Sequence, residues 1–115
     1  MQAPQTAILL RIFVGERDRH GHDPLYEAIV VKAREQGLSG ATALRGVLGF
    51  GASSVLHTAK LLELSDDLPM VVEIVDTEEK VRGFLPVLDG MMSSGLVTLE
   101  KVQVLRYGGP SRDVA

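Results

Sequence analysis

The 115-residue sequence contains no cysteine, no tryptophan and no asparagine. Without cysteine the chain can form neither a disulfide framework nor a thiolate metal site, which is consistent with a cytoplasmic protein. Without asparagine, any reaction that needs an Asn side-chain amide to orient a water molecule or an oxyanion is excluded. These absences exclude some classes of enzyme, but they exclude few folds.

Long apolar runs and excess positive charge are also absent. No apolar run approaches the ~20 residues needed to span a bilayer. The N-terminal MQAPQTA lacks the basic and apolar regions of a signal peptide. The net charge of −3 and the pI near 5.5 argue against a nucleic-acid binder, which usually carries a basic patch. We expect one soluble cytoplasmic domain over residues 1–115, with its core in residues 7–107, and no membrane insertion.

The pattern of apolar residues predicts an α+β protein. We expect Asp23 to cap the first helix, and Asp76 to cap the second in a capping box with Glu79. The order strand, helix, strand, strand, helix, strand is that of the ferredoxin-like fold, with two helices on one face of a four-stranded antiparallel sheet. The predicted strands are residues 7–14, 41–50, 70–75 and 97–107, and the predicted helices are residues 24–36 and 77–93.

The sheet face without helices is predicted to be mainly apolar with a few charges. Such a patch would be an association surface if it were exposed, so we expect it to be buried in a homo-oligomer. Arg11, Arg45 and Glu73 should then be paired within or across subunits, because an unpaired buried charge is costly. The alternative is a monomer in which the arginine stems cover the patch. By strand alternation this face carries Leu9, Arg11, Phe13, Ala43, Arg45, Val47, Val71, Glu73, Val75, Leu105 and Tyr107.

Three glycines mark the centre of the chain. Gly46 and Gly49 fall inside the second predicted strand, and Gly51 follows it. Glycine within a strand suggests a bulge, or a close approach by another backbone or a ligand such as a phosphate or nucleobase. No Gly-Lys-Ser/Thr follows, so this is not a Walker motif, and distortion at a sheet edge explains the glycines equally well. A short helix is expected at residues 53–64.

Other candidate chemistry is weaker. His20 and His22 with Asp23 could hold a metal ion, but no distant third ligand is evident, and a solvated loop is the simpler interpretation. His57 follows Ser53 and Ser54, but no third group would orient the histidine as a base. Asp66 and Asp67, with the acids at residues 76–79, are interpreted as a turn and a helix N-terminus.

At GFGASSVLHT and DLPMVVEIVD the sequence resembles a known family. With LRIFVGE near the N-terminus and VLRY near the C-terminus, it is similar over residues 8–107 to the PII-like proteins of domain of unknown function 190. More distantly it resembles the nitrogen-regulatory PII signalling proteins, whose second strand ends in a GFG-x-HT pattern before a mobile loop.

The resemblance implies a non-enzymatic regulatory homotrimer that binds ligands in clefts between subunits. The implied effector is an adenine nucleotide, and the implied partner is a membrane transporter or channel. Gly49, Phe50 and Gly51 match the segment that contacts the nucleotide. His57 and Thr58 match the start of the mobile loop, and Arg106 matches a basic residue of the last strand.

The sequence departs from the PII pattern in two places. The loop at residues 93–96, where PII proteins carry glycine and lysine, has no lysine, so an adenosine monophosphate-type or cyclic ligand fits better than a triphosphate. The loop after GFG has no tyrosine, so modification by uridylylation is not available. The alternative function is a small trimeric metal-binding protein or enzyme that uses the same cleft with His57 or the His20–His22 loop.

Overall fold

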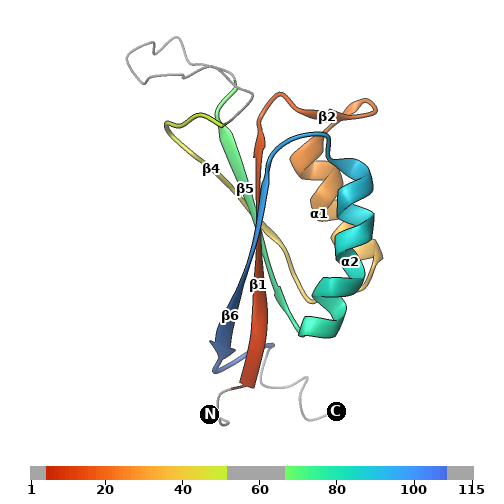
Figure 1. Cartoon of the computed structure of the whole chain (residues 1–115), viewed down its shortest axis with the longest axis vertical. Helices are drawn as coiled ribbons and strands as arrows, with labels where there is room; N and C mark the ends of the chain where they lie inside the picture. Colours follow the sequence, from red (N-terminus) through yellow and green to blue (C-terminus); the bar gives the residue numbers. More distant parts are fainter. Residues whose placement is uncertain (1–4, 52–66, 109–115) are drawn as a thin grey trace.

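The computed structural model describes residues 5–51 and 67–108. Two helices and a four-stranded sheet form two layers (Figure 1), and a two-stranded hairpin precedes the first helix. The elements are β1 (Gln5–Gly15), β2 (Arg19–His20), β3 (Asp23–Pro24), α1 (Leu25–Glu35), β4 (Thr42–Arg45), β5 (Pro69–Asp76), α2 (Glu78–Met91) and β6 (Leu96–Val104).

The large sheet has the strand order β4-β5-β1-β6, with antiparallel pairing throughout. Both helices lie against the same face of this sheet (Figure 1). This confirms the predicted ferredoxin-like fold and its α+β class. In the described part of the chain, no helix is long and apolar enough to cross a membrane.

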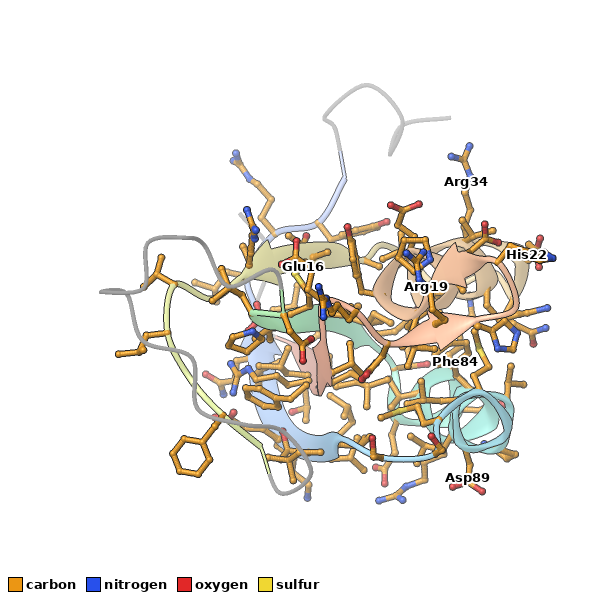
Figure 2. All side chains as sticks on the ribbon, turned by 90° about the horizontal axis from the view of Figure 1, so that it is seen from above. Glu16, Arg19, His22, Arg34, Phe84 and Asp89 are labelled. Atoms are coloured by element: carbon orange, nitrogen blue, oxygen red, sulfur yellow. The ribbon has the colours of Figure 1, made fainter. Side chains whose placement is uncertain are left out.

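The core fills the space between the helices and the sheet. Alternate residues of β1 point into it, and Leu10 and Ile12 are fully buried. Ile29 of α1 and Phe84 of α2 meet them from the other layer, and Phe84 lies between α2 and the sheet in Figure 2. Because one face of β1 carries only branched aliphatic residues, the strand is held at the centre of the sheet by burial as well as by pairing on both edges.

Both helix caps differ from the prediction. Asp23 belongs to β3, and α1 is preceded by Pro24 without a side-chain cap. The N–H of Leu25 instead donates to the carbonyl oxygen of Asp18 (2.7 Å). The cap of α2 is Thr77, whose hydroxyl accepts from the N–H of Lys80 (3.2 Å). The Asp76 carboxylate accepts instead from the N–H groups of Ser39 (2.8 Å) and Thr77 (2.7 Å).

Two strands are shorter than predicted. The second strand of the large sheet, β4, ends at Arg45, so Gly46 and Gly49 lie outside it. The last strand, β6, ends at Val104, which leaves Leu105 and Tyr107 beyond the sheet. The Tyr107 hydroxyl donates to the carbonyl oxygen of Ser39 (2.6 Å), so the chain after β6 folds toward the loop that follows α1.

The pairing register corrects the predicted open face, by which we mean the sheet face opposite the helices. Arg11 pairs with Glu73, and Phe13 with Val71, as the alternation predicted. Thr42 and Leu44 oppose Glu73 and Val71, so Ala43 and Arg45 point to the helix-covered side, not to the open face. On β6 the open face carries Leu96, Thr98 and Glu100, not Leu105 and Tyr107.

The depth of the core gives a stability prediction. Leu10→Ala should lower the free energy of unfolding by about 2–5 kcal/mol, because it removes a fully buried side chain and leaves a cavity. Val31→Ala, at an exposed position on α1, should change it by less than about 0.5 kcal/mol. Urea unfolding measures both. Equal losses for the two variants would contradict the described layer packing.

Candidate functional site

A pocket of about 560 Å³ opens at the end of the sheet where β1 finishes and β5 and β6 begin. We call it the strand-end pocket. Because β1 runs antiparallel to both neighbours, the last residue of β1 lies beside the first residues of β5 and β6. Its wall is formed by Phe13, Val14, Gly15, Asp18, Gly49, Phe50, Gly51, Asp67, Pro69, Ser94, Gly95 and Leu96.

One wall is the glycine segment, residues 46–51, which follows β4 and packs on Pro69. The N–H of Gly46 donates to the carbonyl oxygen of Pro69 (2.7 Å). A Cβ atom on Gly46 would lie 2.8 Å from Pro69 Cγ, and one on Gly49 would lie 3.1 Å from the same atom. The close approach predicted from the glycines is therefore to a proline of β5 inside the chain, and a side chain at either position would push the segment away.

Another part of the wall is the turn between α2 and β6. Gly95 has a φ of 118°, and a Cβ there would lie 2.6 Å from the Phe13 carbonyl oxygen. Only glycine fits this turn without displacing β1. The turn contributes Ser94, Gly95 and Leu96 to the pocket, so the lysine-free loop singled out in the sequence adjoins residues 49–51.

The pocket is mostly apolar. Phe13, Val14, Leu96 and Pro69 line it. Phe50 is also a lining residue, and 71% of its surface is exposed. An exposed ring beside glycine backbone is suited to a planar ligand group, which can stack on the ring while the backbone approaches closely.

Two carboxylates supply the charge of the pocket. Asp18 Oδ2 accepts from the N–H of Gly15 (2.9 Å), and Asp67 Oδ1 accepts from the N–H of Arg17 (3.0 Å). No lysine, arginine or histidine is among the described residues that line the pocket. Sequence reasoning missed both aspartates as site residues.

A topological signal could have found the two aspartates. Asp18 follows the end of the first strand, and Asp67 precedes the start of its antiparallel neighbour. Residues at these two places meet at one sheet edge, whatever their distance in sequence.

The structure brings only some of the predicted ligand residues together. Gly49, Phe50 and Gly51 line the strand-end pocket, whereas His57 and Thr58 lie outside the described residues, as does the expected helix at residues 53–64. Arg106 follows β6, whose end pairs with Gln5 at the far end of β1. Within one chain, Arg106 therefore lies at the opposite end of the sheet from the pocket.

The residues predicted to form the subunit interface do not all lie on the same face of the sheet. On the open face, Arg11 Nε donates to Glu73 Oε2 (2.8 Å), and Arg11 Nη1 lies 3.7 Å from Glu100 Oε1. Arg11 and Glu73 are thus paired within the chain, each with about a third of its side chain exposed. Arg45 instead pairs with Glu16 (3.1 Å) on the other side of the sheet.

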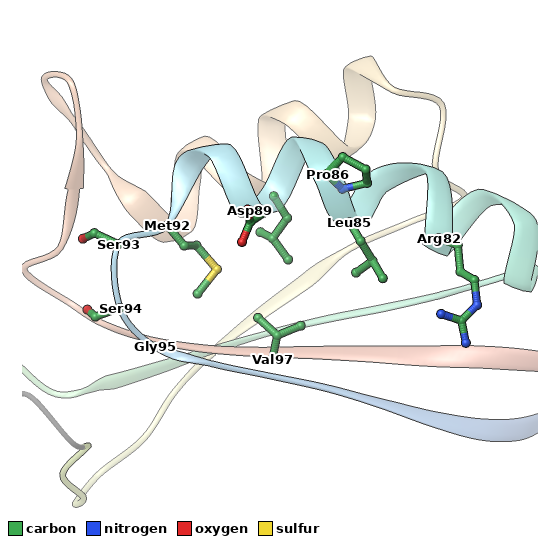
Figure 3. A pocket seen from close by; sticks show the side chains of 10 residues that line it. Arg82, Leu85, Pro86, Asp89, Met92, Ser93, Ser94, Gly95 and Val97 are labelled. Carbon is green, nitrogen blue, oxygen red and sulfur yellow. The ribbon is translucent and has the colours of Figure 1, made fainter.

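A second cavity, of about 660 Å³, separates α2 from β6 (Figure 3). Leu85 of α2 and Val97 of β6 point toward one another across it. Near one end, Arg82 Nε donates to Glu78 Oε2 (2.8 Å). This hydrogen bond and the charge of Arg82 lower the pKa of Glu78, with a smaller effect from Lys101. None of the ligand residues predicted from the sequence lines this cavity.

The candidate metal ligands do not gather into a site. His20 and His22 lie on the exposed β2–β3 hairpin, and His22 is at the periphery of the molecule in Figure 2. Among residues 5–51 and 67–108, no group of three or more His, Cys, Asp or Glu side chains is placed to hold a metal ion.

Comparison with known proteins agrees with this architecture. The DUF190 family, described as "Uncharacterized ACR, COG1993", matches residues 7–104. A UPF0166 protein of Aquifex aeolicus (strain VF5) is 42% identical over 97 residues, covering 84% of this chain and 91% of that protein. UPF0166 protein MJ1524 of Methanocaldococcus jannaschii is 31% identical over 101 residues, covering 87% and 93% of the two chains.

A solved structure extends the likeness to the three-dimensional fold. CPII, a nitrogen regulatory PII-like protein from Thiomonas intermedia K12 bound to ADP, AMP and bicarbonate, matches with a TM-score of 0.61 and 22% identity. The match covers 90% of this chain and 92% of that one, and at this identity it shows the fold. The fold is therefore that of the PII-like proteins. The chain belongs to the DUF190 family.

The contact between the glycine segment and Pro69 can be tested by a double-mutant cycle. Gly46→Ala should cost about 1–3 kcal/mol of unfolding free energy, because its Cβ collides with the proline ring. In a Pro69→Ala background the cost should fall by at least ~0.5 kcal/mol.

Gly83→Ala is the matched control for this cycle. Gly83 lies on α2 with nothing within 4 Å of an added Cβ, so this change should stabilise the protein by about 0.5–1 kcal/mol. Chemical denaturation of the four variants and the wild type measures every step. A Gly46→Ala cost that is unchanged by Pro69→Ala would mean that the two residues do not touch.

Proposed function

We propose that this protein is a non-enzymatic PII-like regulator that binds an adenine nucleotide in the strand-end pocket. The observation that carries the proposal is that residues 49–51 and residues 94–96, far apart in sequence, line one pocket. The likeness to a PII-like protein whose structure holds ADP and AMP supports the choice of ligand class.

The chemistry of the walls supports binding of a base. Phe50 offers an exposed aromatic face, and its two glycine neighbours carry no side chain to keep a ligand away from the backbone. The volume of about 560 Å³ lies within the range of small-molecule sites. An adenine ring stacked on Phe50 is the pose that we propose.

The pocket is less suited to the phosphate end of a nucleotide than to its base. The described lining has no basic side chain, so the pocket of one chain suits adenosine monophosphate or a cyclic nucleotide better than a triphosphate. Arg106 lies at the other end of the sheet. It could reach a phosphate only from a neighbouring subunit, as in a cleft between two chains.

Assembly is the second part of the proposal. Leu44, Val75 and Leu96 are exposed apolar residues on the open face, with exposed fractions of 38–55%. Leu9, Phe13 and Val71 are half-buried beside them. We propose that three copies cover these faces in a homotrimer, because an exposed apolar surface of this kind favours association.

The partner is the third part. Val47 and Leu48 are exposed apolar residues of the glycine segment, leading to the part of the chain around His57 and Thr58. We propose that ligand binding changes how residues 51–68 contact a partner, a membrane transporter or channel being the class that the resemblance implies. Such coupling would be a ligand-dependent switch of the PII kind.

Ligand binding can be tested with a thermal-shift panel of adenosine, AMP, cyclic AMP, ADP and ATP. At ~100 times its dissociation constant, a ligand should stabilise the fold by ~2.7 kcal/mol, a shift of several degrees. Phe50→Ala should weaken binding by about 5- to 150-fold through lost stacking, without lowering the melting temperature of the free protein. Val31→Ala, exposed on α1, is the control and should bind like the wild type.

Two results of this panel would count against the proposal. One is equal nucleotide binding by Phe50→Ala and the wild type. The other is stabilisation by zinc alone, lost when His20 and His22 are both changed to alanine. The second result would favour the metal-binding alternative.

Assembly can be tested by sedimentation of the wild type and one surface variant. The wild type should sediment at about three times the chain mass of 12.4 kDa. Leu44→Glu should dissociate it, because a carboxylate would be buried on the apolar open face without a partner. Val31→Glu on the outer side of α1 should leave the trimer intact. A wild type that is monomeric at micromolar concentration would exclude the trimer.

A further inference from the structure

The strand-end pocket has an unusual charge for a nucleotide site. Asp18 and Asp67 carry the only charged side chains among its described lining residues, and both are acids. A nucleotide phosphate near two carboxylates is repelled, whereas ribose hydroxyls and the exocyclic amine of adenine donate hydrogen bonds that carboxylates accept. The two carboxylates should therefore favour binding of the nucleoside part of a nucleotide and disfavour binding of its phosphates.

Both carboxylates lie close to the Cα of Gly15, on the side where a side chain would point. A Cβ on Gly15 would lie 2.8 Å from Asp67 Oδ1 and 3.4 Å from Asp18 Oδ1. Asp18 is fixed by the N–H of Gly15, and Asp67 by the N–H of Arg17. A carboxylate has about four acceptor positions, so one backbone bond leaves capacity for donors of a ligand. The charges are thus part of the wall and are not on freely rotating surface side chains.

We propose that Asp18 and Asp67 determine the specificity of this pocket. They accept hydrogen bonds from the nucleoside part of the ligand and disfavour nucleotides in proportion to their number of phosphates. This inference rests on the proposed function, because it concerns how the same pocket ranks adenine nucleotides.

The expected size of the effect follows from Coulomb's law. One carboxylate about 7–8 Å from an added phosphate charge, at an effective dielectric constant of roughly 40–80, changes the affinity by about two- to sevenfold. Salt should reduce the effect, since the Debye length is about 8 Å at physiological ionic strength.

The measurement is isothermal titration of adenosine, AMP and ADP into the full-length protein, in EDTA so that no divalent cation bridges phosphate and carboxylate. Asp18→Asn and Asp67→Asn remove one charge each, and their side-chain carbonyl still accepts from the same backbone N–H. Glu79→Gln is the charge-matched control, because Glu79 is exposed in the first turn of α2, at the other end of the sheet.

The readout is the ratio of the ADP dissociation constant to that of AMP. Each aspartate variant should lower this ratio by about two- to sevenfold relative to the wild type, with a smaller drop at high salt, and Glu79→Gln should leave it unchanged. An unchanged or raised ratio in both variants, with AMP still bound, overturns the specificity role and leaves the nucleotide site standing. Failure of the wild type to bind adenosine, AMP or ADP overturns the proposed function and this inference together.

Discussion

The pairing of β1 on both of its edges is the constraint on which the rest of the structure depends. Its register places β5 on one side along residues 8–15, and β6 on the other along residues 5–13. Its helix-side residues, Leu10 and Ile12 among them, are buried beneath α1 and α2. Because one strand sets the offset of both neighbours, the end of β1 meets the starts of β5 and β6. The position of the strand-end pocket is therefore set by the same strand pairing that places the core residues of β1.

The other face of β1, on the open face of the sheet, carries an ion pair among its apolar residues. Arg11 lies in a mainly apolar surface, but it is paired with Glu73 and lies close to Glu100 from the two neighbouring strands. Covering this face with another subunit would therefore not bury an arginine without a partner. Burial of one unpaired charge costs several kcal/mol, whereas a pair that is already formed loses mainly its hydration. The internal ion pair makes the open face compatible with assembly.

The sequence predicted the layers and their order because these depend on long apolar periodicities, such as the alternation from Ile8 to Val14. The prediction of which residues lie on which face of the sheet failed where the two alternating sets of residues along a strand were equally apolar. In β4, Thr42 with Leu44 and Ala43 with Arg45 each combine one polar and one apolar residue, and only the pairing with β5 decides which set lies on the open face. The predicted cap of the second helix was wrong because the Asp76 carboxylate accepts from the N–H groups of Thr77 and of Ser39, a residue distant in sequence. Asp18 and Asp67 were missed as a pair because their proximity depends on strand register.

Different residues of the glycine segment have different explanations, some in the packing of the fold and one in the proposed function. Gly46 and Gly49 are explained by Pro69, whose ring would collide with a Cβ on Gly46 and would have to shift for one on Gly49. These glycines alone are therefore no evidence of a ligand. Phe50 is different, because a segment packed on β5 leaves this ring 71% exposed beside a pocket. An exposed phenylalanine gains nothing from the described core and loses the benefit of burial, about 2 kcal/mol for a large apolar side chain. This exposure is the reason for proposing Phe50, and not the two glycines, as the residue on which a ligand stacks.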